Sequence, residues 1–184
     1  MRLLAGAGIR LSEVDVFAVA TGPGSFTGLR VGIATMQGLA FATGRPLIGV
    51  SALDALAVVG DRYSLEQGSP IGSDGHSRRP PGDPLRIATW VDAWRGEIYA
   101  ALYLGPREVA PAAVSRPEEV LKTLTGSATL FIGNGADSHR DVIRTTMGEQ
   151  GRVADDPAPP LAGTIAELAT RMACDGDLPQ PDAI

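Results

Sequence analysis

The residues best suited to chemistry lie in a glycine-rich segment, residues 22–30, with the sequence Gly-Pro-Gly-Ser-Phe-Thr-Gly-Leu-Arg. Such a turn between a strand and a helix can hold a phosphate, because backbone N–H groups converge there and the helix dipole favours an anion. A P-loop, however, ends in Gly-Lys-Ser/Thr, and a dinucleotide fingerprint reads GxGxxG rather than the GxGxxxG found here. Pro23 also removes one N–H donor. The pattern therefore favours a tight structural turn over a nucleotide site, made by Gly22, Pro23, Gly24, Ser25, Phe26 and Gly28.

The other reactive residue types are scattered along the chain. Cys174 is the single cysteine, the two histidines are His76 and His139, and Lys122 is the single lysine. Neither CxxC nor HExxH occurs, and the segment around Ser25 does not match GxSxG. Asp92 and Glu97 could pass for a carboxylate pair, but two solvated residues beside a turn explain them more simply. We therefore expect no catalytic residue, no cofactor and no metal site.

Composition and charge exclude several classes of protein. With 184 residues and 44% apolar residues, the chain can form one domain or two small lobes. No apolar run reaches the roughly 18 residues of a membrane span, and residues 1–10 are too short for a signal peptide. We expect a soluble, cytoplasmic protein. A net charge of −5 argues against a free-standing tRNA binder, which usually presents a basic face.

The order of predicted elements favours an α/β fold. Residues 14–20 and 47–50 are predicted strands, and residues 27–43 and 52–59 are predicted helices, which gives the alternation of a parallel layer. Residues 85–92 and 97–104 form a predicted hairpin around the turn 93–96. The remaining predictions are a helix end at 2–8, helices at 117–124, 137–146 and 161–173, and a strand at 129–132. Residues 64–84, rich in proline, glycine and serine, are predicted to be a flexible loop or linker, and its Arg78 and Arg79 are most simply solvated.

The predicted helix 27–43 is unusual because Gly28, Gly32 and Gly38 lie within it, each costing about 1 kcal/mol relative to alanine. Ala34, Gly38 and Ala42 share one face at i, i+4 spacing, which would let a second helix approach closely. The helix is also apolar nearly all round, so we expect it to be buried on more than one side. Either packing within its own domain or a subunit interface would account for this pattern.

Several segments resemble the TsaB (YeaZ) family. Residues 22–32, GPGSFTGLRVG, are similar to the family's GPGSFTGLRIG, and residues 38–41 (GLAF) and 46–53 (PLIGVSAL) continue the resemblance. Residues 92–103, DAWRGEIYAALY, are similar to the family's DARRGEVYAALY. The first block is long and specific, and the resemblance runs along the whole chain.

The resemblance implies an actin-like, ribonuclease-H-like α/β fold of two lobes. It also implies a non-catalytic scaffold that activates a TsaD-like transferase, with a TsaE-like ATPase, to form threonylcarbamoyladenosine on tRNA next to the anticodon. A homodimer is a further expectation, and tRNA would be contacted only through the complex. The family's interface is built from helices of the N-terminal lobe, and maps here onto the stub at residues 2–8 and onto the helix 27–43. The residues expected at this interface are Thr27, Arg30, Val31, Ala34, Thr35, Gly38, Leu39 and Ala42.

The chain departs from the family pattern at both ends. Family members open with strands that end in an Asp-Thr-Ser type turn and close with a strand resembling PLYVR; neither occurs here. We therefore expect a truncated chain in which residues 1–63 are the remnant of an N-terminal lobe without its opening strands. Residues 64–84 would be the linker, and residues 85–184 the C-terminal lobe.

Two enzymatic alternatives stay open at this point: a glycoprotease-like enzyme and a nucleotide-binding enzyme of the same superfamily. A protease would need a nucleophile with a base, or a metal triad, which the folded chain could assemble from distant residues. A direct ATP-binding titration separates the nucleotide-binding alternative from the scaffold.

Overall fold

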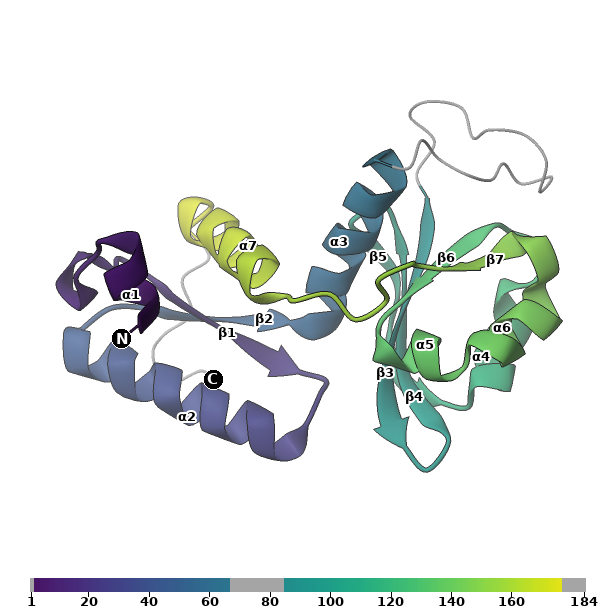
Figure 1. The fold of residues 1–184 in the computed structure, drawn as a ribbon, viewed down its shortest axis with the longest axis horizontal. Coiled ribbons are helices and arrows are strands. Elements are labelled where there is room, and N and C mark those ends of the chain that lie inside the picture. The colour runs from purple at the N-terminus through teal and green to yellow at the C-terminus, as the bar shows by residue number, and fades with distance from the viewer. Residues whose placement is uncertain (1, 67–84, 177–184) are drawn as a thin grey trace. The chain divides into compact units, whose positions relative to one another are not determined.

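The computed structural model describes residues 2–66 and 85–176 (Figure 1). The chain forms two compact units, Met1–Ala52 together with Ala162–Ile184, and Leu53–Leu161. This division differs from the expected lobes of residues 1–63 and 85–184, because the helix after residue 52 packs in the second unit and the last helix packs in the first. Of the predicted linker 64–84, Ser64 continues a helix, and residues 67–84, with His76, Arg78 and Arg79, lie outside the described residues.

The first unit is built on a two-stranded parallel sheet of β1 (Phe17–Gly22) and β2 (Leu47–Ser51), connected by the long helix α2 (Phe26–Thr43). The helix α7 (Ala162–Cys174) also packs on these strands, and Figure 1 shows α2 and α7 on either side of them. A short helix α1 (Arg2–Ala7) and a 3-10 turn η1 (Leu11–Glu13) precede β1. One cluster of buried side chains in this unit consists of Phe17, Val19, Ala40 and Leu47, and Ile48, Val50 and Ala169 are buried as well.

The second unit contains a five-stranded sheet in the order β5-β4-β3-β6-β7. Its strands are β3 (Arg86–Trp94), β4 (Glu97–Leu104), β5 (Arg107–Ser115), β6 (Thr129–Ile132) and β7 (Gly151–Val153). Strands β3, β4 and β5 are antiparallel neighbours, whereas β3, β6 and β7 run parallel. The helices are α3 (Ala52–Glu66), α4 (Pro117–Leu124), α5 (Asn134–Ser138) and α6 (Arg140–Met147), followed by the 3-10 turn η2 (Gly148–Gln150).

Both faces of the strands β3 and β6 are buried, so successive residues of β3 contribute to two different cores. Ile87 and Val91 pack with Leu53 and Leu56 of α3 on one face. Trp90 packs on the other face with residues of α4, α5 and α6, and its ring meets that of Phe131 edge-on at 5.1 Å. Figure 1 shows the same arrangement, with α3 apart from α4, α5 and α6. The second unit is therefore a three-layer α/β structure.

The structure confirms the α/β class and corrects several boundaries. Helix α3 continues past residue 59, because Gly60 lets it lie close to the sheet: a side chain there would come within 3.1 Å of Ile87 Cγ2. The predicted helix 137–146 is divided at His139 (φ −115°, ψ 22°) into α5 and α6. Strands β5 and β7 were not predicted; β5 contains Pro111, which hides a strand pattern and is tolerated at a sheet edge. Among the described residues, no helix is long and apolar enough to cross a membrane.

Candidate partner-binding site

The glycine-rich turn positions the start of α2. Ser25 is the N-cap, and its Oγ accepts a hydrogen bond from the N–H of Gly28 at 3.3 Å. Gly22 has φ 110°, and a side chain at this residue would come within 3.2 Å of Leu29 Cδ1. The backbone of the turn thus lies directly against the first turn of the helix. Ser25, not Thr27, is therefore the residue that caps the start of the helix.

The end of α2 is set by Gly44, which follows its last residue. Gly44 adopts the left-handed conformation (φ 65°), and its N–H donates to the carbonyl O of Phe41 at 3.3 Å. The next N–H, of Arg45, donates to the carbonyl O of Ala40 at 3.1 Å. Both ends of the helix therefore satisfy backbone groups that would otherwise lack partners.

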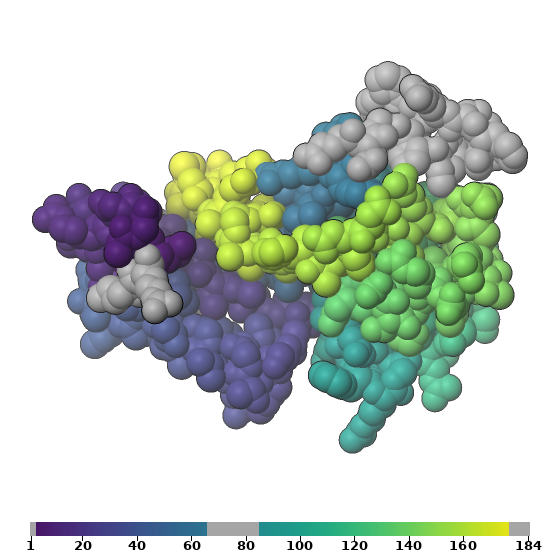
Figure 2. Space-filling model, viewed as in Figure 1, coloured from purple at the N-terminus to yellow at the C-terminus, as the bar shows by residue number. Residues whose placement is uncertain are grey.

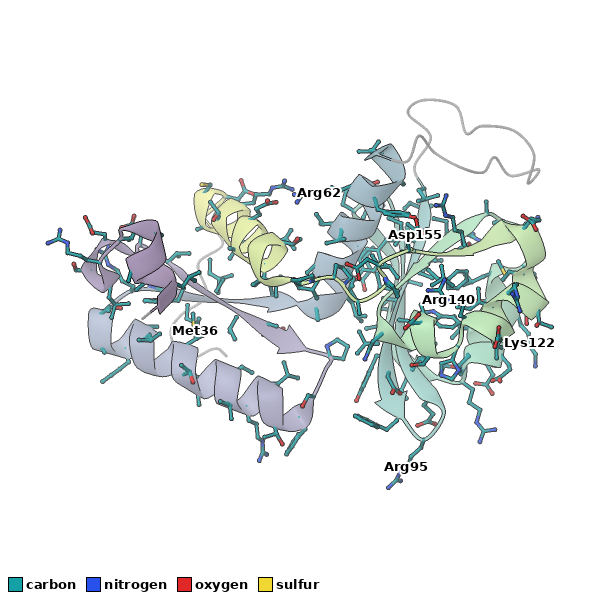
Figure 3. The ribbon with its side chains drawn as sticks, viewed as in Figure 1. Met36, Arg62, Arg95, Lys122, Arg140 and Asp155 are labelled. Carbon is teal, nitrogen blue, oxygen red and sulfur yellow. The ribbon has the colours of Figure 1, made fainter. Side chains whose placement is uncertain are left out.

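One side of α2 faces the small sheet. Ile33, Met36 and Leu39 are partly buried against the core of the first unit, and Ala40 is the one residue of the helix that is fully buried. Figure 3 shows Met36 on the side of the helix that faces the strands. Leu39, which was predicted at the partner interface, thus packs at least in part within its own unit.

The opposite side of α2, called the outer face below, is exposed along the helix; Figure 2 shows α2 as open surface in that view. The outer face consists of Thr27, Arg30, Val31, Ala34, Thr35, Gly38, Phe41 and Ala42, all of them exposed. The helix is therefore buried on one side of the chain, not on two as its apolar pattern predicted. Seven of the eight predicted interface residues lie on this face.

Phe41 was not predicted at the interface although its ring is 92% exposed. Its position was readable from helical spacing, because Phe41 follows Gly38 by three residues and Ala34 by seven. Val31, 61% exposed, adds a second apolar side chain to the same face. The outer face thus combines small residues with exposed apolar ones, which is the chemistry of a protein contact.

An aromatic ring and a cation occupy the N-terminal end of the outer face. The guanidinium carbon of Arg30 lies 4.0 Å from the centre of the Phe26 ring, and Phe26 is 68% exposed. The spacing of four residues brings the two side chains together on one face. Phe26, assigned to the turn from the sequence, therefore also belongs to the exposed surface of α2.

The other residues singled out from the sequence lie in different places. Cys174 is exposed at the end of α7 in the first unit, whereas His139 lies between α5 and α6 in the second. Lys122 is in the last turn of α4. Asp92 Oδ1 accepts a hydrogen bond from the N–H of Trp94 at 2.8 Å, so this carboxylate shapes the hairpin turn. Within residues 2–66 and 85–176, histidine, cysteine and carboxylate side chains do not gather in groups of three or more that could hold a metal.

Comparison with other proteins identifies relatives over the whole chain. The family described as TsaD, tRNA N6-adenosine threonylcarbamoyltransferase, matches residues 1–150. The tRNA threonylcarbamoyladenosine biosynthesis protein TsaB of Escherichia coli (strain K12) is 35% identical over 184 residues, covering 95% of this chain and 70% of the relative. The TsaB protein of Haemophilus influenzae is 28% identical over 179 residues, covering 91% of this chain. The chain spans only 66% of the length of that second relative.

Solved structures agree with these sequence relatives. YeaZ from Pseudomonas aeruginosa superimposes with a TM-score of 0.74 at 30% identity, covering 99% of this chain and 76% of that one. A second structure, described as an uncharacterized protein with similarity to peptidase YEAZ from Pseudomonas aeruginosa, gives a TM-score of 0.73 at 29% identity. The match covers 100% of this chain and 77% of that chain. Together these findings confirm the resemblance and the fold class expected from residues 22–32 and 92–103.

Proposed function

The chain belongs to the TsaB (YeaZ) branch of the family described as TsaD, and on that premise we propose that it is a non-catalytic scaffold subunit. Its role is to bind and activate a TsaD-like transferase that forms threonylcarbamoyladenosine on tRNA. The contact is made by the outer face of α2, with a TsaE-like ATPase joining the assembly. The cytoplasm, where tRNA is modified, is the compartment that fits this role.

The observation that supports this proposal is the exposed outer face of α2. An amphipathic helix of a monomer normally turns polar residues to water. Here Val31 and Phe41 are exposed, and no charged residue follows Arg30 along the face. Burial of such a surface gives roughly 25 cal/mol per Å² of apolar area, so a partner would stabilise it.

The small residues determine which kind of partner fits. Ala34, Gly38 and Ala42 lie one turn apart, and a side chain built on Gly38 meets nothing within 4 Å in this chain. Small residues let the backbones of two helices come close together, so that ridges on one pack into grooves on the other. We therefore propose that the partner element is a helix of the transferase, and that a second copy of the chain would use the same face.

The test is an association measurement with the Ala34→Arg variant. Its exposed position predicts that the variant stays folded but binds the TsaD-like subunit about 100-fold more weakly or worse, because an arginine would hold the helices apart. Isothermal titration calorimetry measures the affinity, circular dichroism checks the fold, and mass spectrometry of tRNA reports threonylcarbamoyladenosine formed by the assembled complex.

The matched control is Ala166→Arg, which places the same side chain on an exposed alanine of α7 in the same unit. This variant should bind like the unmodified chain. Equal affinities of the two arginine variants for the transferase would disprove the role of the outer face. Sedimentation of the chain alone shows whether a second copy also occupies that face.

A further inference from the structure

The tip of the β3–β4 hairpin carries an exposed tryptophan next to an arginine. Trp94 is 71% exposed, whereas Trp90, four residues earlier in the same strand, is fully buried. Arg95 is also exposed, and Figure 3 shows it at the tip, pointing away from the second unit. An exposed aromatic residue needs no explanation by itself. The backbone around Trp94 supplies a reason to look further.

Three consecutive residues at the tip have positive φ: 67° at Trp94, 57° at Arg95 and 79° at Gly96. A two-residue hairpin turn of type I′ requires positive φ at both central residues, here Arg95 and Gly96, and normally uses asparagine, aspartate or glycine in them. Trp94 lies before that turn, paired with Glu97, and a bulky residue in this conformation is an outlier. Strained backbone of this kind persists only where surrounding contacts hold it, and it is concentrated at functional sites.

Two hydrogen bonds hold the tip in this conformation. Asp92 Oδ1 accepts the N–H of Trp94 at 2.8 Å, and the N–H of Asp92 donates to Asn134 Oδ1 at 3.1 Å. Asn134 is itself fixed, because the flanking Gly133 and Gly135 lie directly against the backbone of β3 at residues 90–92. The loop after β6 thus supports the end of β3. Trp94 is therefore presented to solvent by a preorganised backbone.

On the basis of the proposed function, we propose that Trp94 and Arg95 form a contact for single-stranded RNA, with the indole stacking on an unpaired base and the guanidinium binding the adjacent phosphate. Aromatic faces combined with a nearby cation are the usual means of holding unpaired bases, because every base offers a π face. A protein partner would instead need a wider apolar patch, since hot-spot residues lie at the centre of a buried area. The chain neighbours of Trp94 at the tip, Ala93, Arg95, Gly96 and Glu97, do not include another large apolar side chain.

The contrast between the two tryptophans provides the test. A short oligoadenylate is titrated into the chain at low salt while tryptophan fluorescence is recorded. A stacked base quenches the exposed Trp94 but not the buried Trp90, so about half of the emission should respond. Inorganic tripolyphosphate, which carries charge without bases, should leave the emission unchanged.

Variants assign the contact to its residues. By the anisotropy of a labelled oligoadenylate, Trp94→Leu should weaken binding about ten-fold and Arg95→Gln several-fold. Trp94→Phe, which keeps an aromatic face, should stay close to the unmodified chain. The control Arg107→Gln removes an exposed arginine from β5 and should have no effect.

Absence of quenching, equal quenching by tripolyphosphate, or unchanged binding by Trp94→Leu would each overturn the RNA contact. The proposal would also be overturned if Trp94→Leu bound RNA normally but bound the transferase more weakly, since the tip would then be a protein contact. Failure of the proposed function is recognised separately, by the transferase affinity of Ala34→Arg. If that variant fails to associate while oligoadenylate leaves Trp94 unquenched, the scaffold role stands and the RNA contact does not.

Discussion

Tyr103 carries a hydroxyl group in the core of the second unit. The residue is 2% exposed, and its hydroxyl donates a hydrogen bond to Asp54 Oδ1 of α3 at 2.7 Å. Burial, and then the Asp54 carboxylate, raise the pKa of Tyr103 well above its ordinary value of 10.0. The neutral phenol is therefore strongly favoured in the folded state, and it ties α3 to β4.

Tyr103→Phe should lower the free energy of unfolding by about 1–2 kcal/mol at neutral pH, because the variant loses one hydrogen bond to a carboxylate that water can still reach. The raised pKa adds a pH dependence. The unfolded phenol ionises near pH 10 and the folded one only at higher pH, so the stability of the unmodified chain is fully present below pH 10 and falls above it. The phenylalanine variant should lack that component of the alkaline loss.

Urea unfolding at several pH values measures both effects. The control is Tyr99→Phe in the same strand, which should change the free energy of unfolding by no more than about 0.5 kcal/mol. An alkaline loss of stability that is unchanged in Tyr103→Phe would contradict the assignment.

The roles of single residues could be predicted from the sequence where their partners lie within a few residues along the chain. The Ser25 cap and the Gly44 stop each involve backbone groups no more than four residues away. The exposure of Trp94 could not be predicted, because it depends on the hydrogen bond between Asp92 and Asn134, which are 42 residues apart in the sequence. The carboxylate of Asp92 was correctly predicted to lie beside a turn, but its bond to the N–H of Trp94 required the folded hairpin.

Among the elements, the junction between β6 and α5 depends most closely on one residue. Gly133 has φ 116°, and its N–H donates to the carbonyl O of Pro157 at 2.6 Å. A side chain at Gly133 would overlap the carbonyl O of Trp90 in β3. The direct approach of this turn to β3 therefore requires glycine.

Gly133→Ala should destabilise the protein by at least about 3 kcal/mol, because backbone strain and the overlap with β3 add together. The matched control is Gly126→Ala, where φ is 85° but nothing lies within 4 Å of the added carbon. The control should cost only about 1 kcal/mol, since strain acts alone. Thermal unfolding of both variants measures the difference, and equal losses would show that contact with β3 contributes nothing.

The boundaries of helices and strands could be predicted where a local sequence pattern sets them. The prediction failed where packing against other elements sets the boundary. Helix α4 and strand β6 were predicted at their observed bounds, since proline and acidic residues mark the start of α4, and β6 is a threonine followed by three apolar residues. Helix α3 was cut short at Gly60, which is a helix breaker by propensity but a packing residue against Ile87. The sequence predicted that these residues share one face of α2. It could not predict that this face is exposed, because the exposure depends on the small sheet, which packs on the other side of the helix.

At the scale of the whole molecule, the two units differ in how much core they contain. Among the described residues, the second unit holds most of the buried apolar side chains and buries both faces of β3 and β6, whereas the first relies on two strands and a smaller set of buried apolar residues. Two-stranded sheets are marginal unless other elements cover them, here α2 and α7. The described part of the first unit should therefore be the less stable one, and the unit that gains most from a partner on α2.

Hydrogen exchange followed by mass spectrometry tests this difference. Amides of β1 and β2 should exchange faster than those of β3, β4 and β6, because local opening of the first unit exposes less apolar surface. Addition of the TsaD-like subunit at about 100 times its dissociation constant should stabilise the bound unit by about 2.7 kcal/mol, which slows its exchange roughly 100-fold. The protection should begin at α2 and extend to β1 and β2, which pack on it. The Ala34→Arg variant should show no such protection. Equal exchange in the two units would contradict the assignment of lower stability to the first unit. Protection confined to the second unit would contradict the use of the outer face.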